Sequence, residues 1–162
     1  MAVTTLRPNA PGATQNWDAE GGDYTRVDEA SSDGDTTRLY TPTNGRVATF
    51  NLDASGLSGV AITGVTVYIN TRSLDAIDNT VQLVVRTGGT DYFSSDKVYN
   101  STSYHLESAT WSTNPNTGMA WTISEVDALE AGMKRISGGG QAVTQVYVEV
   151  TSSVARRIFI VS

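Results

Sequence analysis

The stretch 65-VTVYIN-70 alternates strictly: its odd-numbered residues are apolar and its even-numbered residues are polar. Two other stretches, 81-VQLVVR-86 and 146-VYVEVT-151, also carry apolar residues at every second position. Successive side chains of a β-strand point to opposite faces, so this period indicates strands with one face on a core and one face toward water. The three stretches therefore predict half-buried β-strands.

Further strand candidates are separated by residues that favour turns. The candidates are 37-TRLYT-41, 46-RVATFNL-52, 91-DYFSS-95, 103-SYHLESATW-111 and 156-RRIFIV-161. The turns between strands include Asn44-Gly45, 55-SGLSG-59, Gly88-Gly89, Asn114-Pro115 and 137-SGGG-140. Helices do not alternate with the strands, which disfavours a parallel fold. We predict an all-β fold, an antiparallel β-sandwich or jelly roll of about eight strands with one short α-helix.

The helix is expected within 121-WTISEVDALEAGMKRI-136. Thr122 and Glu125 form the T-x-x-E pattern of a capping box, and apolar residues follow at helical spacing. Gly132 is expected at the C′ position, where glycine commonly ends a helix. We predict a short helix over about residues 123 to 131 that covers the core at one end of the sandwich.

The net charge of −6 is concentrated near the N-terminus. Residues 18–35 contain seven acidic residues and one arginine, so the remainder of the chain is neutral overall. The first 36 residues are also polar and rich in glycine and proline. We predict an extended acidic arm over residues 1–36 and a β-sandwich domain over residues 37–162. We expect the sandwich to fold without residues 2–20.

Composition excludes several classes of protein. The absence of cysteine excludes disulfides, thiolate catalysis and iron–sulfur clusters. An acidic chain with two lysines is poorly suited to nucleic acid, because binding to phosphates requires positive charge. The N-terminus lacks the apolar core of a signal peptide, and no apolar run approaches the roughly 20 residues of a membrane helix. We expect a protein that is made in the cytoplasm and has no nucleic-acid or membrane partner.

The acidic stretch 28-DEASSDGDTTR-38 raises the question of a metal site. Placing Gly34 at the sixth position of an EF-hand leaves a tyrosine at the twelfth, where calcium requires a bidentate glutamate, so an EF-hand is excluded. A looser calcium site remains one interpretation. Its ligands would be Asp33 and Asp35, supported by Asp28 or Glu29. We favour the alternative, in which Asp28 and Asp33 close turns by accepting hydrogen bonds from backbone amides.

Catalytic chemistry finds little support in the sequence. A Ser-His-Asp arrangement would need His105, the single histidine, which alternation places on one strand face with Ser103 and Glu107. No G-x-S-x-G motif occurs, and no pair of acids flanked by aromatic residues indicates a glycosidase. We expect no enzymatic activity.

Aromatic residues allow a second kind of function. Sandwich domains can bind sugars by stacking them on aromatic rings, and Trp17, Tyr24 and Tyr40 lie in or beside the acidic segment. Trp111 and Trp121 flank the stretch 112-STNPNTGMA-120. For these two tryptophans we favour a structural role, in which they hold that loop onto the core.

Several stretches together resemble jelly-roll-like β-sandwich domains of tailed-bacteriophage virion proteins. They are 5-TLRPN-9, Val27-Asp28-Glu29 followed by 35-DTT-37, 64-GVTVYIN-70, 111-WSTNPNTGMAWTISEVDALEAG-132 and 143-VTQVYVEV-150. The block from 111 to 132 is the most distinctive, and the resemblance spans nearly the whole chain. It implies a non-enzymatic virion component, with no catalytic residues.

Our first hypothesis from this resemblance is a capsid decoration (cement) protein on the outside of a phage head, located on the capsid surface of the virion. Its partners would be the major capsid protein and further copies of the chain, as a homo-oligomer or through lattice contacts. The candidate partner-binding residues are Leu6, Arg7, Trp17, Asp28, Glu29, Arg156 and Arg157. The alternative is a carbohydrate-binding or receptor-binding jelly-roll module of a phage tail or fibre.

Overall fold

The alternating stretch at residues 65–70 forms the middle of β5 (Val60–Ser73), a central strand of a five-stranded sheet. The strand order is β1 (Ala2–Leu6), β11 (Gln141–Val154), β5 and β9 (His105–Trp111), and β3 (Leu39–Thr41) also pairs with β11. The computed structural model describes residues 1–17 and 23–154. Within these residues no helix is long and apolar enough to cross a membrane.

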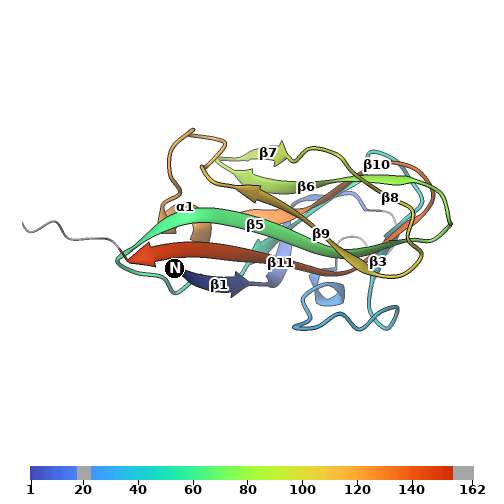
Figure 1. Ribbon diagram of the computed structural model, residues 1–162, viewed down its shortest axis with the longest axis horizontal. Coiled ribbons are helices and arrows are strands. Elements are labelled where there is room, and N and C mark those ends of the chain that lie inside the picture. Colours follow the sequence, from blue (N-terminus) through green and yellow to red (C-terminus); the bar gives the residue numbers. More distant parts are fainter. Residues whose placement is uncertain (18–22, 155–162) are drawn as a thin grey trace, which may run out of the picture.

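A six-stranded sheet packs against the first one (Figure 1). Its order is β2 (Pro8–Gln15), β4 (Val47–Leu52), β10 (Glu130–Ser137), β6 (Asn79–Thr87) and β7 (Thr90–Phe93), with β8 (Lys97–Tyr99) also paired to β6. The pairings in both sheets are antiparallel. The predicted all-β antiparallel sandwich is confirmed, and the described residues form eleven strands rather than about eight.

The core lies between the two sheets, where the apolar faces of their strands meet. Val65, Val67 and Ile69 of β5 are fully buried, whereas Tyr68 between them is on the outer face and half-buried. Burying one such aliphatic side chain contributes about 1.5–3 kcal/mol. The facing sheet supplies further buried residues, among them Phe50, Leu83 and Met133, and the neighbouring β11 adds Val146, Val148 and Val150. The period-two pattern in the sequence therefore identified the inward face correctly.

The predicted arm is largely part of the sandwich, which corrects the boundary at residue 36. β1 pairs with β11 in one sheet and β2 pairs with β4 in the other. Leu6 is 1% exposed and Trp17 is 2% exposed, both within the core. Deleting residues 2–20 would remove two strands and these core side chains, so we now expect the sandwich not to fold without them. The sequence of β2 concealed the strand because it contains two prolines, which an edge strand tolerates.

The helix is shorter than predicted. In α1 (Ile123–Asp127) the expected capping box is formed: Glu125 N donates to Thr122 Oγ1 at 3.2 Å, and Thr122 N donates to Glu125 Oε2 at 2.8 Å. The predicted continuation to residue 131 is wrong, because β10 begins at Glu130. Gly132 is a strand residue rather than a helix C′ residue. A Cβ atom at this position would collide with the carbonyl oxygen of Ala48 on β4.

The two tryptophans that flank residues 112–120 hold this loop on the sandwich, as expected. Trp121 is buried, and its Nε1 donates to the carbonyl oxygen of Trp111 at 3.0 Å. Within the loop, Asn114 is buried and its Nδ2 donates to Thr87 Oγ1 at 3.3 Å. This pair of tryptophans is therefore structural.

The backbone contact at Gly132 gives a stability prediction. We expect Gly132→Ala to lower the free energy of unfolding by about 3 kcal/mol, because the added methyl group displaces a backbone carbonyl rather than a flexible side chain. Gly64→Ala in β5 is the matched control, since its added Cβ atom would meet only Thr110 Cγ2 at 3.7 Å. Urea unfolding of both variants measures the difference. Equal losses in the two variants would contradict this account.

Candidate functional site

The acidic stretch lies along the edge of β11. This strand pairs with β1 through residues 148–152 and with β3 through residues 141–143, which leaves the middle of that edge without a strand partner. There Val146 N donates to Val27 O at 2.8 Å, and Gln145 Nε2 donates to Glu29 O at 2.7 Å. We call residues 27–38 the acidic strap. It is an integral part of the sheet edge.

Asp33 closes a turn within the strap, as we favoured from the sequence. Its Oδ1 accepts a hydrogen bond from Thr37 N at 3.3 Å, and its Oδ2 accepts one from Thr37 Oγ1 at 2.9 Å. Thr144 Oγ1 on β11 also donates to Asp33 Oδ1 at 3.0 Å. Slight desolvation would raise the pKa of Asp33, but the hydrogen bonds from Thr37 and Thr144 outweigh it and hold the pKa below its ordinary value. Asp33 thus fastens the strap to β11.

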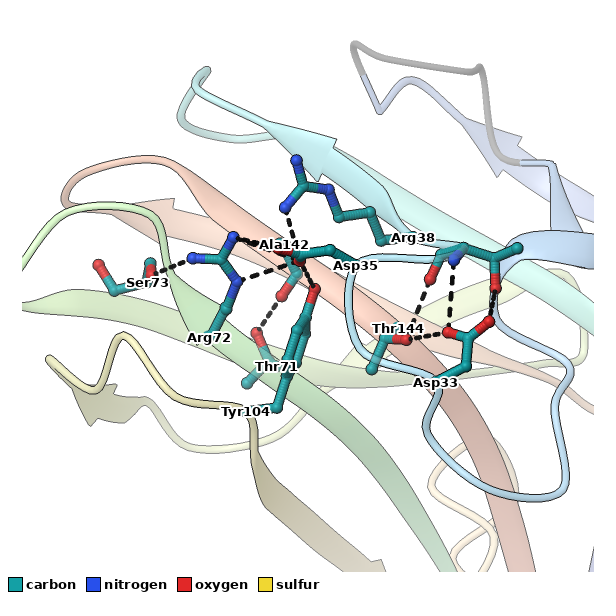
Figure 2. Close-up of polar contacts among 10 residues, drawn as sticks. Asp33, Asp35, Arg38, Thr71, Arg72, Ser73, Tyr104, Ala142 and Thr144 are labelled. Carbon is teal, nitrogen blue, oxygen red and sulfur yellow. Dashed lines mark hydrogen bonds and ion pairs between the residues drawn. The ribbon is translucent and has the colours of Figure 1, made fainter.

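Asp35 joins the strap to the outer face of the sheet, as Figure 2 shows. Its carboxylate accepts hydrogen bonds from Tyr104 Oη at 2.7 Å, Arg38 Nη1 at 2.6 Å and Arg72 Nη2 at 3.0 Å. The Arg72 guanidinium also lies 5.4 Å from the centroid of the Tyr104 ring. The hydrogen bond from Tyr104, followed by the contacts with the two arginines, lowers the pKa of Asp35.

The two nominated calcium ligands therefore bind separate sets of protein donors. Asp33 contacts threonines of the strap and β11, whereas Asp35 contacts two arginines and a tyrosine. In the part of the chain that the structure describes, no three acidic, histidine or cysteine side chains gather as metal ligands would. Calcium binding remains a prediction, and this geometry offers it no ready coordination shell.

The candidate partner-binding residues have different fates. The prediction that Leu6 and Trp17 bind a partner is wrong, because both side chains are buried in the core and cannot reach a partner. Arg7 is half-buried, and its Nη1 donates to Glu29 O at 2.6 Å. Glu29 itself accepts a hydrogen bond from Thr37 Oγ1, and burial raises its pKa. Asp28 is half-buried in the strap. Arg156 and Arg157 lie outside the described residues.

A row of flat side chains crosses the outer face of the five-stranded sheet. Tyr147 on β11 and Tyr68 on β5 are directly paired, and their rings stack with centroids 4.7 Å apart and planes 7° apart. The Arg7 guanidinium lies 5.7 Å from the Tyr147 centroid on the other side. Burial, then the nearby Glu149 carboxylate, raises the pKa of both tyrosines. We call Arg7, Tyr68, Tyr147 and Glu149 the tyrosine platform.

On the side away from Tyr147, the strand next to Tyr68 is β9. Adjacent strands lie about 4.8 Å apart, close to the ring separation, so the two rings stand upright on neighbouring strands with their faces together. Ser108 is the residue paired with Tyr68 on β9, and its hydroxymethyl group is too small to cover a phenol ring. The neighbouring Thr66 and Thr110 hydroxyls lie 2.8 Å apart beside it. Small and polar residues therefore border Tyr68 on the side of β9.

No pattern in the sequence indicates this platform, although the alternation places Tyr68 on the wet face of its strand. The pairing of Tyr68 with Tyr147 depends on the register between β5 and β11, which are distant in the sequence. The sequence proposes Arg7 as a partner-binding residue rather than as part of an aromatic stack. In the structure its guanidinium donates to the carbonyl oxygens of Glu29 and Ala30 in the strap, which hold it in place.

His105 and Glu107 share the inward side of β9, opposite Thr71 and Ile69. Their side chains approach within 3.3 Å, and the His105 ring packs edge-on against Tyr99 with centroids 4.7 Å apart. Burial raises the pKa of Tyr99 to about 12, so this phenol stays protonated at neutral pH and its oxygen bonds to Thr71 Oγ1 at 2.9 Å. Through Tyr99, this group packs against the core.

The contacts of Asp35 predict a dependence of stability on pH. Its folded-state pKa lies below the ordinary value of 3.8, so its contribution is present above that value and is lost as the pH falls through the folded-state pKa. We expect Asp35→Asn to cost up to about 1 kcal/mol at neutral pH, because 54% of the side chain is exposed and water screens the charge. The cost should vanish in strong acid.

Urea unfolding at neutral pH and at roughly pH 2 measures this difference. The exposed Asp53→Asn is the control for loss of a carboxylate. A cost for Asp35→Asn that is unchanged in acid would show that the charge contacts are not its cause.

No protein-family model matches the chain, and no curated protein matches it. Among solved structures it is similar to the family 32 carbohydrate-binding module of C. perfringens NanJ, in complex with galactose. The identity is 10%, over 91% of this chain and 99% of that one, with a TM-score of 0.50. A second match is the Clostridium thermocellum xylanase 10B CBM22-1–GH10 modules complexed with xylohexaose. Here the identity is 8%, over 99% of this chain and 27% of that one, and the TM-score of 0.44 is too low to argue from. The first likeness shows that this chain shares the β-sandwich fold of a carbohydrate-binding module.

Proposed function

We propose that this chain is a non-catalytic module that binds carbohydrate at the tyrosine platform. The observation that carries the proposal is the stack of Tyr68 on Tyr147, with the small residue Ser108 paired to Tyr68 on its other side. Sugars present C–H groups on the faces of their rings and hydroxyls around the rim. An immobilised aromatic face next to polar groups suits such a ligand.

The groups around Tyr68 match the two parts of a sugar. The space above Ser108 can admit a ring against Tyr68, and the exposed Leu106 on β9 extends the apolar contact. The Thr66 and Thr110 hydroxyls can exchange hydrogen bonds with the sugar rim, and Glu149 beyond them supplies an acceptor. The ring is held by Tyr147 and Arg7 before a ligand arrives, so little side-chain entropy is lost on binding.

The described residues enclose no pocket, so the platform is an open surface. Small ligands bind tightly when a concave site buries most of their surface. We therefore expect weak binding of single sugars and stronger binding when several modules engage a surface rich in glycans.

The fold likeness to a carbohydrate-binding module supports this proposal at the level of architecture. The resemblance of the sequence to virion proteins supports placing the module on a phage tail or fibre, where it would bind a glycan receptor. The capsid-decoration hypothesis relied on a free N-terminal arm, and two of its docking residues, Leu6 and Trp17, are in the core. Carbohydrate binding is the function that the geometry favours.

The proposal predicts that Tyr68→Ala weakens glycan binding about tenfold, which corresponds to the loss of one stacking contact. Phe93→Ala is the matched control, because Phe93 is a partly exposed aromatic residue on the other sheet. A glycan array identifies the ligand, and calorimetric titration with that glycan measures the affinities. An array without binding, or equal weakening by Phe93→Ala, would exclude the platform as a sugar site.

The same titration tests the calcium prediction. We expect a chelator to leave the affinity unchanged, because protein donors already contact both Asp33 and Asp35. If the chelator abolished binding and added calcium restored it, calcium would be a required ligand. The Asp33→Asn variant would then show whether the strap holds the ion.

A further inference from the structure

Glu149 places a negative charge beside the two tyrosines of the platform. It lies on β11 two residues after Tyr147, so both side chains are on the outer face of the sheet. The register pairs Tyr147 with Tyr68 and pairs Glu149 with Thr66 on β5. Glu149 and Tyr68 are therefore diagonal neighbours on the same face, about 7 Å apart, a separation that lies within reach of two long side chains.

The residues paired with Glu149 carry hydroxyls. Its partner on β1 is Thr5, and its partner on β5 is Thr66. Thr110 on β9 follows in the same row, with its hydroxyl 2.8 Å from that of Thr66. Within residues 1–17 and 23–154, no arginine or lysine forms an ion pair with Glu149. In that part of the chain, no partner side chain neutralises the carboxylate.

The arginines on this face of the sheet are engaged by the strap. Arg7 lies on the β1 side of Tyr147, whereas Tyr68 lies on the β5 side. Both Nη atoms of Arg7 donate to carbonyl oxygens of the strap. Arg72, further along β5, binds the Asp35 carboxylate at 3.0 Å (Figure 2). A sugar beside Tyr68 therefore has a carboxylate and hydroxyls next to it, while the strap occupies these two arginines.

The two phenol groups of the platform respond to this charge. Burial, then the Glu149 carboxylate, raises the pKa of Tyr68 and of Tyr147 above the ordinary value of 10.0. A raised pKa means that the protein disfavours a phenolate, which would be an anion on the platform. The carboxylate or sulfate of an acidic sugar would bring a charge of the same sign to the same place. The platform is therefore unfavourable for an anionic ligand.

We propose that the tyrosine platform selects neutral glycans, and that Glu149 is the residue that excludes glycans bearing a carboxylate or a sulfate. This inference rests on the proposed function, because it concerns the same site. The hydroxyls of a neutral sugar donate hydrogen bonds to the Glu149 carboxylate, and an ionised acceptor makes such bonds stronger. An acidic sugar meets repulsion between like charges instead, which weakens its binding about tenfold at low salt.

Two ligands that differ in charge test the proposal on the unmodified protein. The probes are a neutral glycan that binds on the array and its derivative in which a primary alcohol is oxidised to a carboxylate. In calorimetric titrations we expect the derivative to bind about tenfold more weakly at low salt. The difference should shrink at about 1 M salt, where the screening length falls to about 3 Å. Equal affinities at low salt, or tighter binding of the derivative, would overturn the proposal.

The variant Glu149→Gln separates the charge of this residue from its shape. Glutamine is similar in size and still accepts hydrogen bonds, so we expect binding of the neutral glycan to weaken only about threefold. The tenfold deficit of the carboxylate derivative should disappear. Asp78→Asn, at an exposed position between β5 and β6, is the matched control and should retain the deficit. A deficit that persists in Glu149→Gln, or that disappears equally in Asp78→Asn, would show that Glu149 does not select the ligand.

The glycan array distinguishes failure of this inference from failure of the proposed function. We expect the glycans that bind the unmodified chain but not Tyr68→Ala to be neutral. If those glycans were all acidic, sugar binding at the platform would stand and the selection of neutral glycans would be overturned. An array without binding that depends on Tyr68 would overturn both. Circular dichroism checks that each variant keeps its sheets.

Discussion

Backbone pairing along β11 is the constraint on which the remainder of the structure depends. This 14-residue strand pairs along its whole length with β5 on one side. The backbone groups on its other side also need partners, since buried amides and carbonyls without hydrogen bonds are costly. Three short segments supply those partners in turn, namely β1, the acidic strap and β3. One long strand thereby orders much of the N-terminal region, and it positions Tyr147 and Arg7 in the platform.

Sequence alone predicted the fold well where a pattern had a single interpretation. The alternation around Val67 fits a strand only, and the strand is there. Leu129 and Met133 are four residues apart, a spacing that places two side chains on one face of a helix and also on one face of a strand. Both are core residues in the structure, where β10 has replaced the second half of the predicted helix. The glycine that seemed to end a helix is required instead by a close backbone contact with β4.

The candidate site was less predictable than the fold, for a reason that individual residues make clear. The turn around Asp33 is local, so its threonine and aspartate neighbours indicated it. Trp17 lies in a polar stretch of the sequence, which suggested an exposed side chain. Burying its large apolar ring stabilises the fold more than leaving it on an exposed arm, and the structure places it in the core. The stack of Tyr68 on Tyr147 is determined by strand register, and neither residue is unusual in its own stretch.

The position of the acidic strap also has an electrical consequence. Four acids, from Asp28 to Asp35, lie in the strap along one edge of the five-stranded sheet. Three arginines, Arg7, Arg38 and Arg72, lie against the same segment and offset most of this negative charge locally. Opposite charges so close together largely cancel at a distance, so this edge exerts little long-range attraction or repulsion on a charged surface. At physiological ionic strength, salt screens the remaining field beyond about 8 Å.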